Sequence, residues 1–403
     1  MPDLGVRWLF DGKGVIYEEA LLVWEDGRVV AVEPNRARRA KIYLRQAIIL
    51  PGLVNAHTHL DLSTLRAEEL PRAACAWLNQ VIAHRRQATP EIVAEAVQRG
   101  IRESLRCGVT LVGDIAGSPQ TLLYLNGACL RARVFVEVVG LSRSRARATW
   151  RTARQLLTSK SETTFVRLGL SPHAPYSTRR SLFRLAARSG WPLAIHWAEF
   201  AEERDLLISR AGPFRDWLEA LGVWEERGLI SDYDELLDLI TPAPKTLFIH
   251  LNYPDTSLKH VLPVWASQGR AGVVYCPRTH AYFGHMAHSW LRWLEQEVPV
   301  VFGTDSLASN PDLNVLNELR FLWSRGCPLA PAQLFQRVTH TAAELLGWPE
   351  TGALCPGQWA DFVVMPLTDS RVSNPLQSLL ESQVLPQYVY VAGQLVFDAA
   401  HSG

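Results

Sequence analysis

The sequence lacks the features that mark membrane, secreted or nucleic-acid-binding proteins. No apolar run reaches the roughly 18 residues that a membrane-spanning helix needs, and the stretch MPDLGVRWLFDGKG lacks the apolar core of a signal peptide. The 41 Lys and Arg residues balance 40 Asp and Glu residues, without a long block of one charge. We therefore expect a cytoplasmic protein with neither nucleic acid nor a membrane surface as partner.

Paired cysteines and nucleotide-binding glycines are also missing. The six cysteines are scattered without C-x-x-C spacing, which is typical of reduced thiols in a long cytosolic chain. Among them, Cys276 has no obvious dedicated base and is interpreted as structural. No G-x-G-x-x-G segment opens a helix after the first strand, so nothing marks a dinucleotide site.

What the sequence does have is a middle region that alternates between apolar runs of strand length and helical stretches. Eight such runs occur; the first leads into His57, and the others are Val109–Val112, Val134–Val139, Val166–Leu170, Leu193–His196, Leu247–His250, Gly272–Tyr275 and Val298–Gly303. Continuous apolar runs are typical of parallel strands buried on both faces, and eight βα units predict a (β/α)₈ TIM-like barrel of the α/β class. A doubly wound open sheet is the main alternative.

Both ends of the chain show a different pattern, with short strands separated by turn signals such as Asp11-Gly12 and Asp26-Gly27. This pattern predicts a small β-sandwich built from both termini. The expected domains are residues 1–50 and 351–403 for the sandwich and residues 51–350 for the barrel. Residues 201–245 form the longest insertion, which we interpret as an elaborated βα loop near the site.

The first barrel strand ends in His57-Thr58-His59. Because alternate residues of a strand point to the same side, the two imidazoles project together as a candidate pair of metal ligands. Two unrelated polar residues at a strand end are the alternative interpretation.

Polar residues also follow four other predicted strands, at the barrel end where active sites gather. The segments are Ser171–Tyr176 after the fourth strand, His196–Glu199 after the fifth, His250 after the sixth and Gly303–Ser306 after the eighth. Any one of these segments could be structural. Their convergence with the first strand favours an active site.

This set offers three imidazoles and one carboxylate to a single divalent ion. The predicted ligands are His57, His59, His196 and Asp305. Zn²⁺ is the expected ion, and iron or manganese accept the same ligands. A bound cation lowers the pKa of its water towards 7. Glu199 is placed to move a proton as general acid and base, and His250 to hydrogen-bond the attacking water.

Together, H-T-H after the first strand, H-x-x-E on the fifth, His on the sixth and G-T-D on the eighth resemble the amidohydrolase superfamily. Within it they resemble the mononuclear deaminase branch. The resemblance implies that Asp305 binds metal and takes a proton from water, while Glu199 protonates the ring nitrogen and His250 steadies the nucleophile. Dinuclear relatives carry a Lys on the fourth strand, and Val166–Leu170 has none, which favours one metal ion.

Finer features concern the substrate, for which we expect an aminopurine nucleoside. His173–Ser177, with His173 and Tyr176 as predicted contacts, resembles S-adenosylhomocysteine/methylthioadenosine deaminases. Residues 275–285 and 303–313, which include the predicted contact Ser306, are more similar to 6-aminodeoxyfutalosine deaminases, which act on an adenine nucleoside carrying a benzoate in the futalosine route to menaquinone. Arg85 or Arg86 falls where S-adenosylhomocysteine/methylthioadenosine deaminases have a ribose-binding Glu. An Arg there, with Arg86 as the predicted contact, suits a substrate carboxylate.

Several alternatives stay open at this point. S-adenosylhomocysteine/methylthioadenosine deaminase, guanine deaminase and triazine chlorohydrolase share the metal chemistry, whereas an inactive scaffold relative belongs to another class. The sequence leaves a homodimer open. His280 and His285 are candidate substrate contacts, and His288 is expected to be a solvated surface residue.

Overall fold

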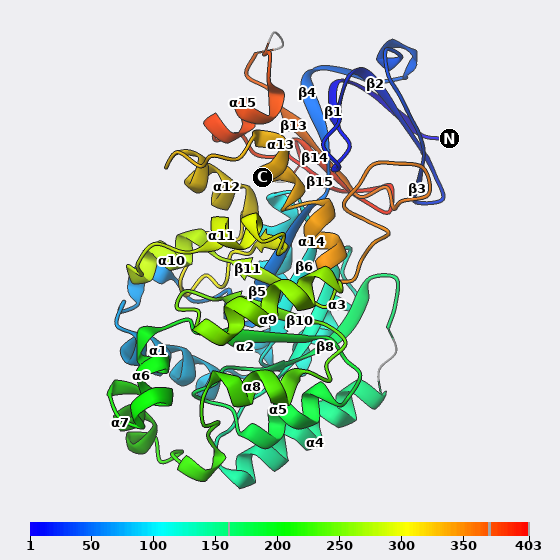
Figure 1. Ribbon diagram of the computed structural model, residues 1–403. Helices are drawn as coiled ribbons and strands as arrows, with labels where there is room; N and C mark the ends of the chain where they lie inside the picture. Colours follow the sequence, from blue (N-terminus) through cyan, green and yellow to red (C-terminus); the bar gives the residue numbers. More distant parts are fainter. Residues whose placement is uncertain (160–161, 370–371, 402–403) are drawn as a thin grey trace.

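The computed structural model describes residues 1–159, 162–369 and 372–401. Its larger sheet has eight parallel strands, each beside its neighbour in the chain, in the order β12-β11-β10-β9-β8-β7-β6-β5 (Figure 1). The strands are β5 (Leu53–Thr58), β6 (Val109–Ala116), β7 (Arg131–Val138), β8 (Val166–Pro172), β9 (Leu193–Trp197), β10 (Thr246–His250), β11 (Ala271–Tyr275) and β12 (Val300–Phe302).

The first and last of these strands meet and nearly close the sheet into a barrel. Just after β12, the backbone N–H groups of Thr304 and Asp305 donate to the carbonyl oxygen of His57 over 3.1 and 3.0 Å. Thr58 and Asp305 also form a parallel bridge. The predicted (β/α)₈ architecture is confirmed, and the open doubly wound sheet is wrong.

The barrel strands are covered on the outside by helices, as their composition predicts. Every residue of β5, β6, β9, β10, β11 and β12 is buried, because these apolar strands pack against side chains on both faces. The helices are α1 (Ala74–Gln87), α2 (Pro90–Arg106), α3 (Gln120–Leu125), α4 (Arg143–Ser159), α5 (Arg180–Ala187), α6 (Ala201–Ser209), α7 (Pro213–Ala220), α8 (Tyr233–Ile240), α9 (Thr256–Ser267), α10 (Pro277–Phe283), α11 (Trp290–Glu295), α12 (Val315–Trp323), α13 (Pro331–Gln336), α14 (His340–Leu345) and α15 (Pro375–Glu381). Within the described ranges, no helix combines the length and apolar character needed to cross a membrane.

The second sheet joins the two ends of the chain, seen as blue and orange-red strands at the top of Figure 1. Its order is β15-β14-β13-β4-β1-β2-β3. The strands are β1 (Asp3–Phe10), β2 (Ile16–Glu25), β3 (Arg28–Glu33), β4 (Tyr43–Pro51), β13 (Phe362–Pro366), β14 (Tyr388–Val391) and β15 (Gln394–Asp398). Strand β4 is the junction, because it pairs in parallel with β1 and antiparallel with β13.

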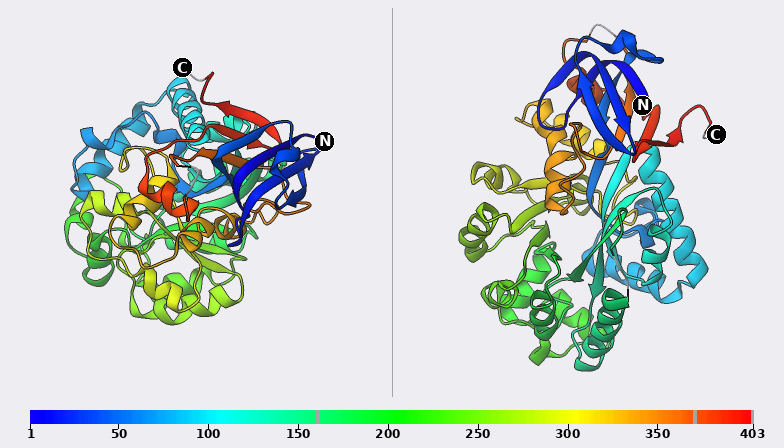
Figure 2. Two further views of the ribbon diagram at one scale, coloured as in Figure 1. Left: turned by 90° about the horizontal axis from the view of Figure 1, so that it is seen from above. Right: turned by 90° about the vertical axis from the view of Figure 1, so that its right-hand side faces the viewer.

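This terminal sheet is hydrogen-bonded as one sheet and curls over its own core (Figure 2). The ring of Trp24 on β2 packs at 5.2 Å from Phe362 on β13 and at 5.8 Å from Tyr390 on β14, although these strands are not neighbours. The curl therefore gives the two facing layers of a sandwich from a single sheet. We propose domain limits at residues 50 and 350, close to where β4 ends and the chain returns towards β13.

A buried ion pair fastens the barrel to the terminal sheet. The guanidinium of Arg131 on β7 binds Asp361, just before β13, through two bonds of 2.6 and 3.1 Å, and both side chains are fully buried. Asp361 also accepts hydrogen bonds from Thr351 and from the backbone of Ala392. The Asp361 carboxylate thus accepts hydrogen bonds from three segments of the chain, which carry Arg131, Thr351 and Ala392.

We expect Asp361→Ala to lower the free energy of unfolding by about 3–5 kcal/mol, because it leaves a buried guanidinium without its counter-charge. Urea denaturation followed by circular dichroism measures this. Asp238→Ala, on the exposed surface of α8, is the matched control and should change stability by no more than about 0.5 kcal/mol. Equal effects of the two substitutions would contradict the role of Asp361.

Candidate metal and active site

The site begins where β5 ends. His57, within the strand, and His59, one residue beyond it, are both buried, and their Nε2 atoms lie 3.4 and 3.5 Å from Oδ1 of Asp305. Gly303 permits this approach of the β12 loop, since a Cβ there would lie 2.8 Å from backbone atoms of His57. The glycine before Thr304 is therefore required by packing.

His196 on β9 completes a group of three imidazoles. Its Nε2 lies 3.2 Å from Nε2 of His59, and its Nδ1 lies 3.0 Å from the carbonyl oxygen of His173. A carbonyl can only accept, so this contact assigns the proton to Nδ1 and leaves Nε2 with a free lone pair. A carbonyl oxygen that accepts from Nδ1 in this way fixes the orientation of a histidine whose Nε2 can bind metal.

Three features of these residues fit a divalent metal ion. The ligand atoms of His57, His59 and His196 lie within 4.8 Å of one another, as do those of His57, His250 and Asp305. Neither ring nitrogen of His57 has a hydrogen-bond partner in the described ranges, although both are buried. Burial lowers the pKa of His59 and His196 well below the ordinary value, so both rings are neutral and available as ligands.

The carboxylate of Asp305 is held as the anionic member of the group. Burial alone would raise its pKa, but contact with His57 and a hydrogen bond from the Ser309 hydroxyl (2.7 Å) keep it below the ordinary value. The residue adopts a left-handed conformation with φ of +57°, and its carbonyl accepts from the Thr58 hydroxyl. The turn therefore aims one carboxylate oxygen at the histidines and the other at Ser309.

Glu199 and His250 face each other across the same space. Oε1 of Glu199 lies 3.6 Å from Nε2 of His250. Burial, with the nearby charge of Asp305, raises the pKa of Glu199 well above its ordinary value, and burial lowers the pKa of His250 to about 3. A protonated carboxyl group beside a neutral imidazole is suited to deliver a proton.

The insertion at residues 201–245 supports the turn that carries Glu199. Glu203, at the start of α6, is fully buried and accepts hydrogen bonds of 2.8 Å from the backbone of Ala198 and from the hydroxyl of Tyr233 on α8. Ala198 has a left-handed φ of +49°. The insertion thus holds the strained turn between His196 and Glu199.

Glu203 should make stability depend on pH. Burial raises its pKa from 4.5 to about 8. Between these values the folded chain keeps a proton that the unfolded chain has lost, so stability falls as pH rises, by up to about 1.4 kcal/mol per pH unit from this group. We expect Glu203→Gln, which cannot ionise, to flatten the dependence of unfolding free energy on pH from 5 to 8. Parallel curves for wild type and variant would contradict this, and Glu202→Gln is the control.

A cluster of charged side chains lies beside His59; its members are Asp61, Arg85 and Glu137. The Arg85 guanidinium lies 2.9 Å from Glu137 and 3.4 Å from Asp61. Burial lowers the pKa of Arg85, but the two carboxylates outweigh this and raise it. Arg86, the next residue, is exposed and has no ion pair in the described part of the chain. Of the two arginines proposed for a substrate carboxylate, Arg86 is therefore the unpaired one.

Two adjacent cavities lie at the histidines. The inner chamber, about 40 Å³, has Ser306 and Trp77 in its lining together with His59, His196, Glu199, His250 and Asp305. The outer chamber, about 360 Å³, is lined by Arg86, Arg145 and apolar side chains that include Trp217 from the insertion. Residues that line both chambers are Leu78, Val81, Arg85, His173 and Tyr176.

Sequence reasoning missed several supporting residues and misjudged one. His288 was expected on the solvated surface, which is wrong: its Nε2 lies 2.7 Å from the carbonyl oxygen of His250, and its ring stacks at 3.9 Å on Tyr275. Asn252 donates to the carbonyl of Glu199 and also contacts His280. Burial raises the pKa of the Cys276 thiol well above its ordinary value, which agrees with a structural role.

Comparison with known proteins gives consistent matches. The profile of the Amidohydrolase family matches residues 48–396. The aminodeoxyfutalosine deaminase of Deinococcus radiodurans is 31% identical over 68% of this chain and 68% of its own. The 5-methylthioadenosine/S-adenosylhomocysteine deaminase of Nitratidesulfovibrio vulgaris is 28% identical over 96% of this chain and 90% of its own.

Solved structures share the fold at lower identity. A crystal structure of Helicobacter pylori aminofutalosine deaminase in complex with methylthio-coformycin has a TM-score of 0.84 and 24% identity, covering 98% of this chain and all of that one. An adenosine deaminase from Xanthomonas campestris with bound zinc has a TM-score of 0.81 and 21% identity, covering 98% of this chain and 92% of that one. These structures support the same barrel and terminal sheet.

Proposed function

The chain belongs to the amidohydrolase family and is a hydrolase acting on carbon–nitrogen bonds, and we propose that it deaminates 6-aminodeoxyfutalosine. The coarser class, an aminopurine nucleoside deaminase, agrees with both curated relatives. The observation that favours the finer substrate is the outer chamber, whose apolar walls and exposed Arg86 and Arg145 suit a benzoate tail.

We propose that His57, His59, His196 and Asp305 hold one divalent ion, Zn²⁺ being the expected one. When bound, such an ion supplies a Lewis acid that activates water at neutral pH. Asp305 offers its second carboxylate oxygen, which accepts a hydrogen bond of 2.7 Å from the Ser309 hydroxyl, as a proton acceptor. The structure supports this set through the mutual approach of the ligand atoms.

Glu199 and His250 carry out the remaining steps of the proposed reaction. A neutral carboxyl at Glu199 donates its proton to the ring nitrogen beside the amino-bearing carbon, which makes that carbon electrophilic. His250, neutral and fixed through its carbonyl by His288, holds the attacking oxygen in line. Asp305 then passes the proton that it took from water to the amino group, the carbon–nitrogen bond breaks and ammonia departs. The hydroxyl proton left on that carbon returns to Glu199 as the carbonyl forms, and the ring nitrogen keeps its proton.

In the outer chamber, we propose that the nucleoside's aromatic acid lies between Trp217 and the leucine side chains, with its carboxylate towards Arg86 and Arg145. The ring of Tyr176 lies 4.6 Å from Phe214 and 6.2 Å from Trp217, so the insertion provides an aromatic wall beside the ribose position. His173, hydrogen-bonded to Ser177, and Ser306 in the inner chamber are the proposed ribose and base contacts.

S-adenosylhomocysteine/methylthioadenosine deamination is the second candidate, because the relative with that name matches nearly the whole chain. Guanine deaminase and chlorohydrolase activities share the same centre. An inactive scaffold is disfavoured by the presence of all proposed ligands and proton donors in one buried cluster.

A substrate panel tests the proposal. The zinc-loaded protein is assayed for ammonia release from aminodeoxyfutalosine, S-adenosylhomocysteine, methylthioadenosine, adenosine and guanine, and for chloride release from a chlorotriazine. We expect the highest kcat/KM for aminodeoxyfutalosine. A higher value for methylthioadenosine would move the assignment to the second candidate, and reaction of the chlorotriazine alone would overturn deamination.

We expect Arg86→Met to raise KM for aminodeoxyfutalosine by about three- to tenfold, because an exposed charge-assisted hydrogen bond is lost. KM for methylthioadenosine, which has no carboxylate, should stay unchanged. Initial-rate kinetics on both substrates measure this, with Arg102→Met on α2 as a matched surface control. An unchanged KM for both substrates would remove Arg86 from the site.

A further inference from the structure

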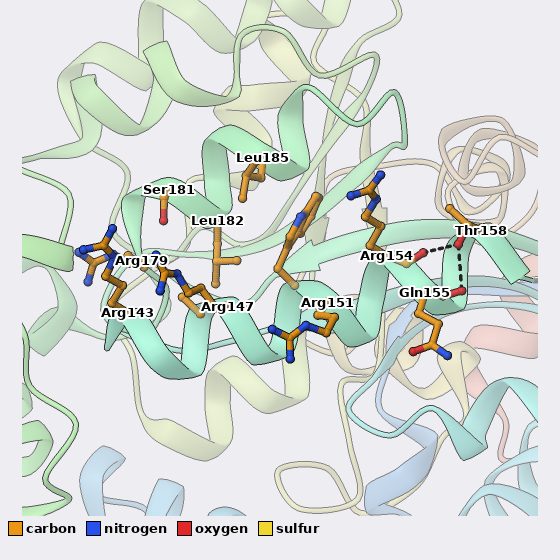
Figure 3. A pocket seen from close by; sticks show the side chains of 12 residues that line it. Arg143, Arg147, Arg151, Arg154, Gln155, Thr158, Arg179, Ser181, Leu182 and Leu185 are labelled. Atoms are coloured by element: carbon orange, nitrogen blue, oxygen red, sulfur yellow. Dashed lines mark hydrogen bonds between the residues drawn. The ribbon is translucent and has the colours of Figure 1, made fainter.

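A groove of about 960 Å³ runs along the outside of the barrel, between α4 and α5 (Figure 3). Both helices lie at the opposite end of the molecule from the terminal sheet (Figure 1). Arginine side chains line the groove; they are Arg143, Arg147, Arg151 and Arg154 from α4 and Arg179 from the turn before α5. The groove is separate from the two chambers that lead to the metal ligands.

The four groove arginines of α4 make few contacts with acidic groups in the described part of the chain; Glu225 lies beside Arg143 and accepts a hydrogen bond of 3.0 Å from its backbone N–H. All four are exposed, and none forms an ion pair with a residue in the described ranges. Arg179 differs, because Glu225 binds it at 2.5 Å. The guanidinium groups of Arg147, Arg151 and Arg154 are therefore available to bind an external anion, each with a planar fork that matches phosphate oxygens.

The charge is concentrated in this part of the sequence. Residues 139–198 contain 11 of the 41 Lys and Arg residues and only one of the 40 Asp and Glu residues. The arginines stand four apart at Arg143, Arg147 and Arg151, so like charges face each other along the helix, which is destabilising. Arg143 also sits at the positive end of the helix dipole. An anion in the groove would relieve both repulsions.

One wall of the groove is apolar. Trp150 is half-buried between the arginine positions on α4, and Leu182 and Leu185 approach from α5. Leu185 remains 43% exposed. From Arg143 to Arg154 the helical rise spans about 17 Å, which is enough for an extended phosphate chain together with a nucleoside. The groove thus offers both charged and apolar walls to a bound molecule.

We propose that this groove binds a nucleoside polyphosphate. Arg147, Arg151 and Arg154 bind the phosphate chain, and the base lies against the ring of Trp150 and the adjoining leucines. The ligand sits on the outside of the barrel and is not the molecule that is hydrolysed. The inference is independent of the substrate assigned to the metal site.

Fluorescence anisotropy of N-methylanthraniloyl-ATP with the full-length protein tests the site, and unlabelled ATP, tripolyphosphate, adenosine and an RNA hexamer serve as competitors. The groove variant is Arg147→Gln/Arg151→Gln. The matched control is Arg102→Gln/Arg292→Gln, which removes two exposed helical arginines that have no ion pair in the described part of the chain. We expect the groove variant to weaken ATP binding by about tenfold for each arginine lost, and higher salt to weaken it further.

The control variant should bind ATP like the wild type, and all three proteins should melt at similar temperatures. Equal affinity of groove variant and wild type, or no binding at all, would overturn the site. Stronger competition by the RNA hexamer than by ATP would overturn a small-molecule ligand in favour of nucleic acid. Competition by tripolyphosphate as strong as that by ATP would overturn the role of Trp150.

Discussion

Replacing Glu199 by Gln is expected to lower kcat for deamination by about 10³-fold while the bound metal is retained. A glutamine fills the same volume beside His250 but carries no acidic proton for the ring nitrogen, and proton transfer of this kind contributes about 10²–10⁴ to the rate. Because Glu199 is not among the proposed ligands, metal content should stay at the wild-type value. Ammonia release and metal analysis of the same preparation measure the two quantities.

The matched control is Glu295→Gln, an exposed carboxylate on α11. It should leave kcat unchanged within a factor of two. A Glu199→Gln variant that deaminates at more than a tenth of the wild-type rate would show that the proton comes from another group. Loss of metal from that variant would instead place Glu199 among the ligands.

Asp305→Asn should remove both metal affinity and activity. The amide has nearly the same shape and can still contact Ser309, yet it brings no negative charge to the three imidazoles and accepts no proton at neutral pH. We expect metal content below half an ion per chain after dialysis, measured by plasma mass spectrometry, and a fall in kcat of at least about 10³-fold even with added zinc.

Asp205→Asn, on the exposed face of α6, controls for the charge change. It should retain wild-type metal content and rate. A fully loaded and active Asp305→Asn protein would contradict both roles given to Asp305, since neither a ligand nor a proton acceptor would then be needed there.

The barrel was predictable because its strands are buried on both faces and read as uninterrupted apolar runs. Their order follows from the alternation with helices, and parallel strands carry their carboxyl ends to one side of the barrel. His57, His196 and Asp305 were therefore expected together although they are far apart in the sequence. The curl of the terminal sheet was harder to predict from the sequence, because contacts such as that of Trp24 with Phe362 join opposite ends of the chain.

The supporting hydrogen bonds were not predictable from the sequence. Ser309 and Glu203 lie in loops and first turns where no periodicity indicates which way a side chain points. His288 looked like an exposed loop residue, but the loop folds back so that its ring stacks on Tyr275. Arg85 and Arg86 are adjacent on α1, and only the rotation of that helix decides which of them meets Glu137.

We propose that one metal ion in the histidine cluster enables deamination of an aminopurine nucleoside. The most direct test strips the protein with a chelator and follows ammonia release from aminodeoxyfutalosine during titration with zinc. We predict no release from the stripped protein and full activity at one zinc ion per chain. Full activity without metal, or no release from any aminopurine nucleoside with one zinc ion bound, would contradict the claim.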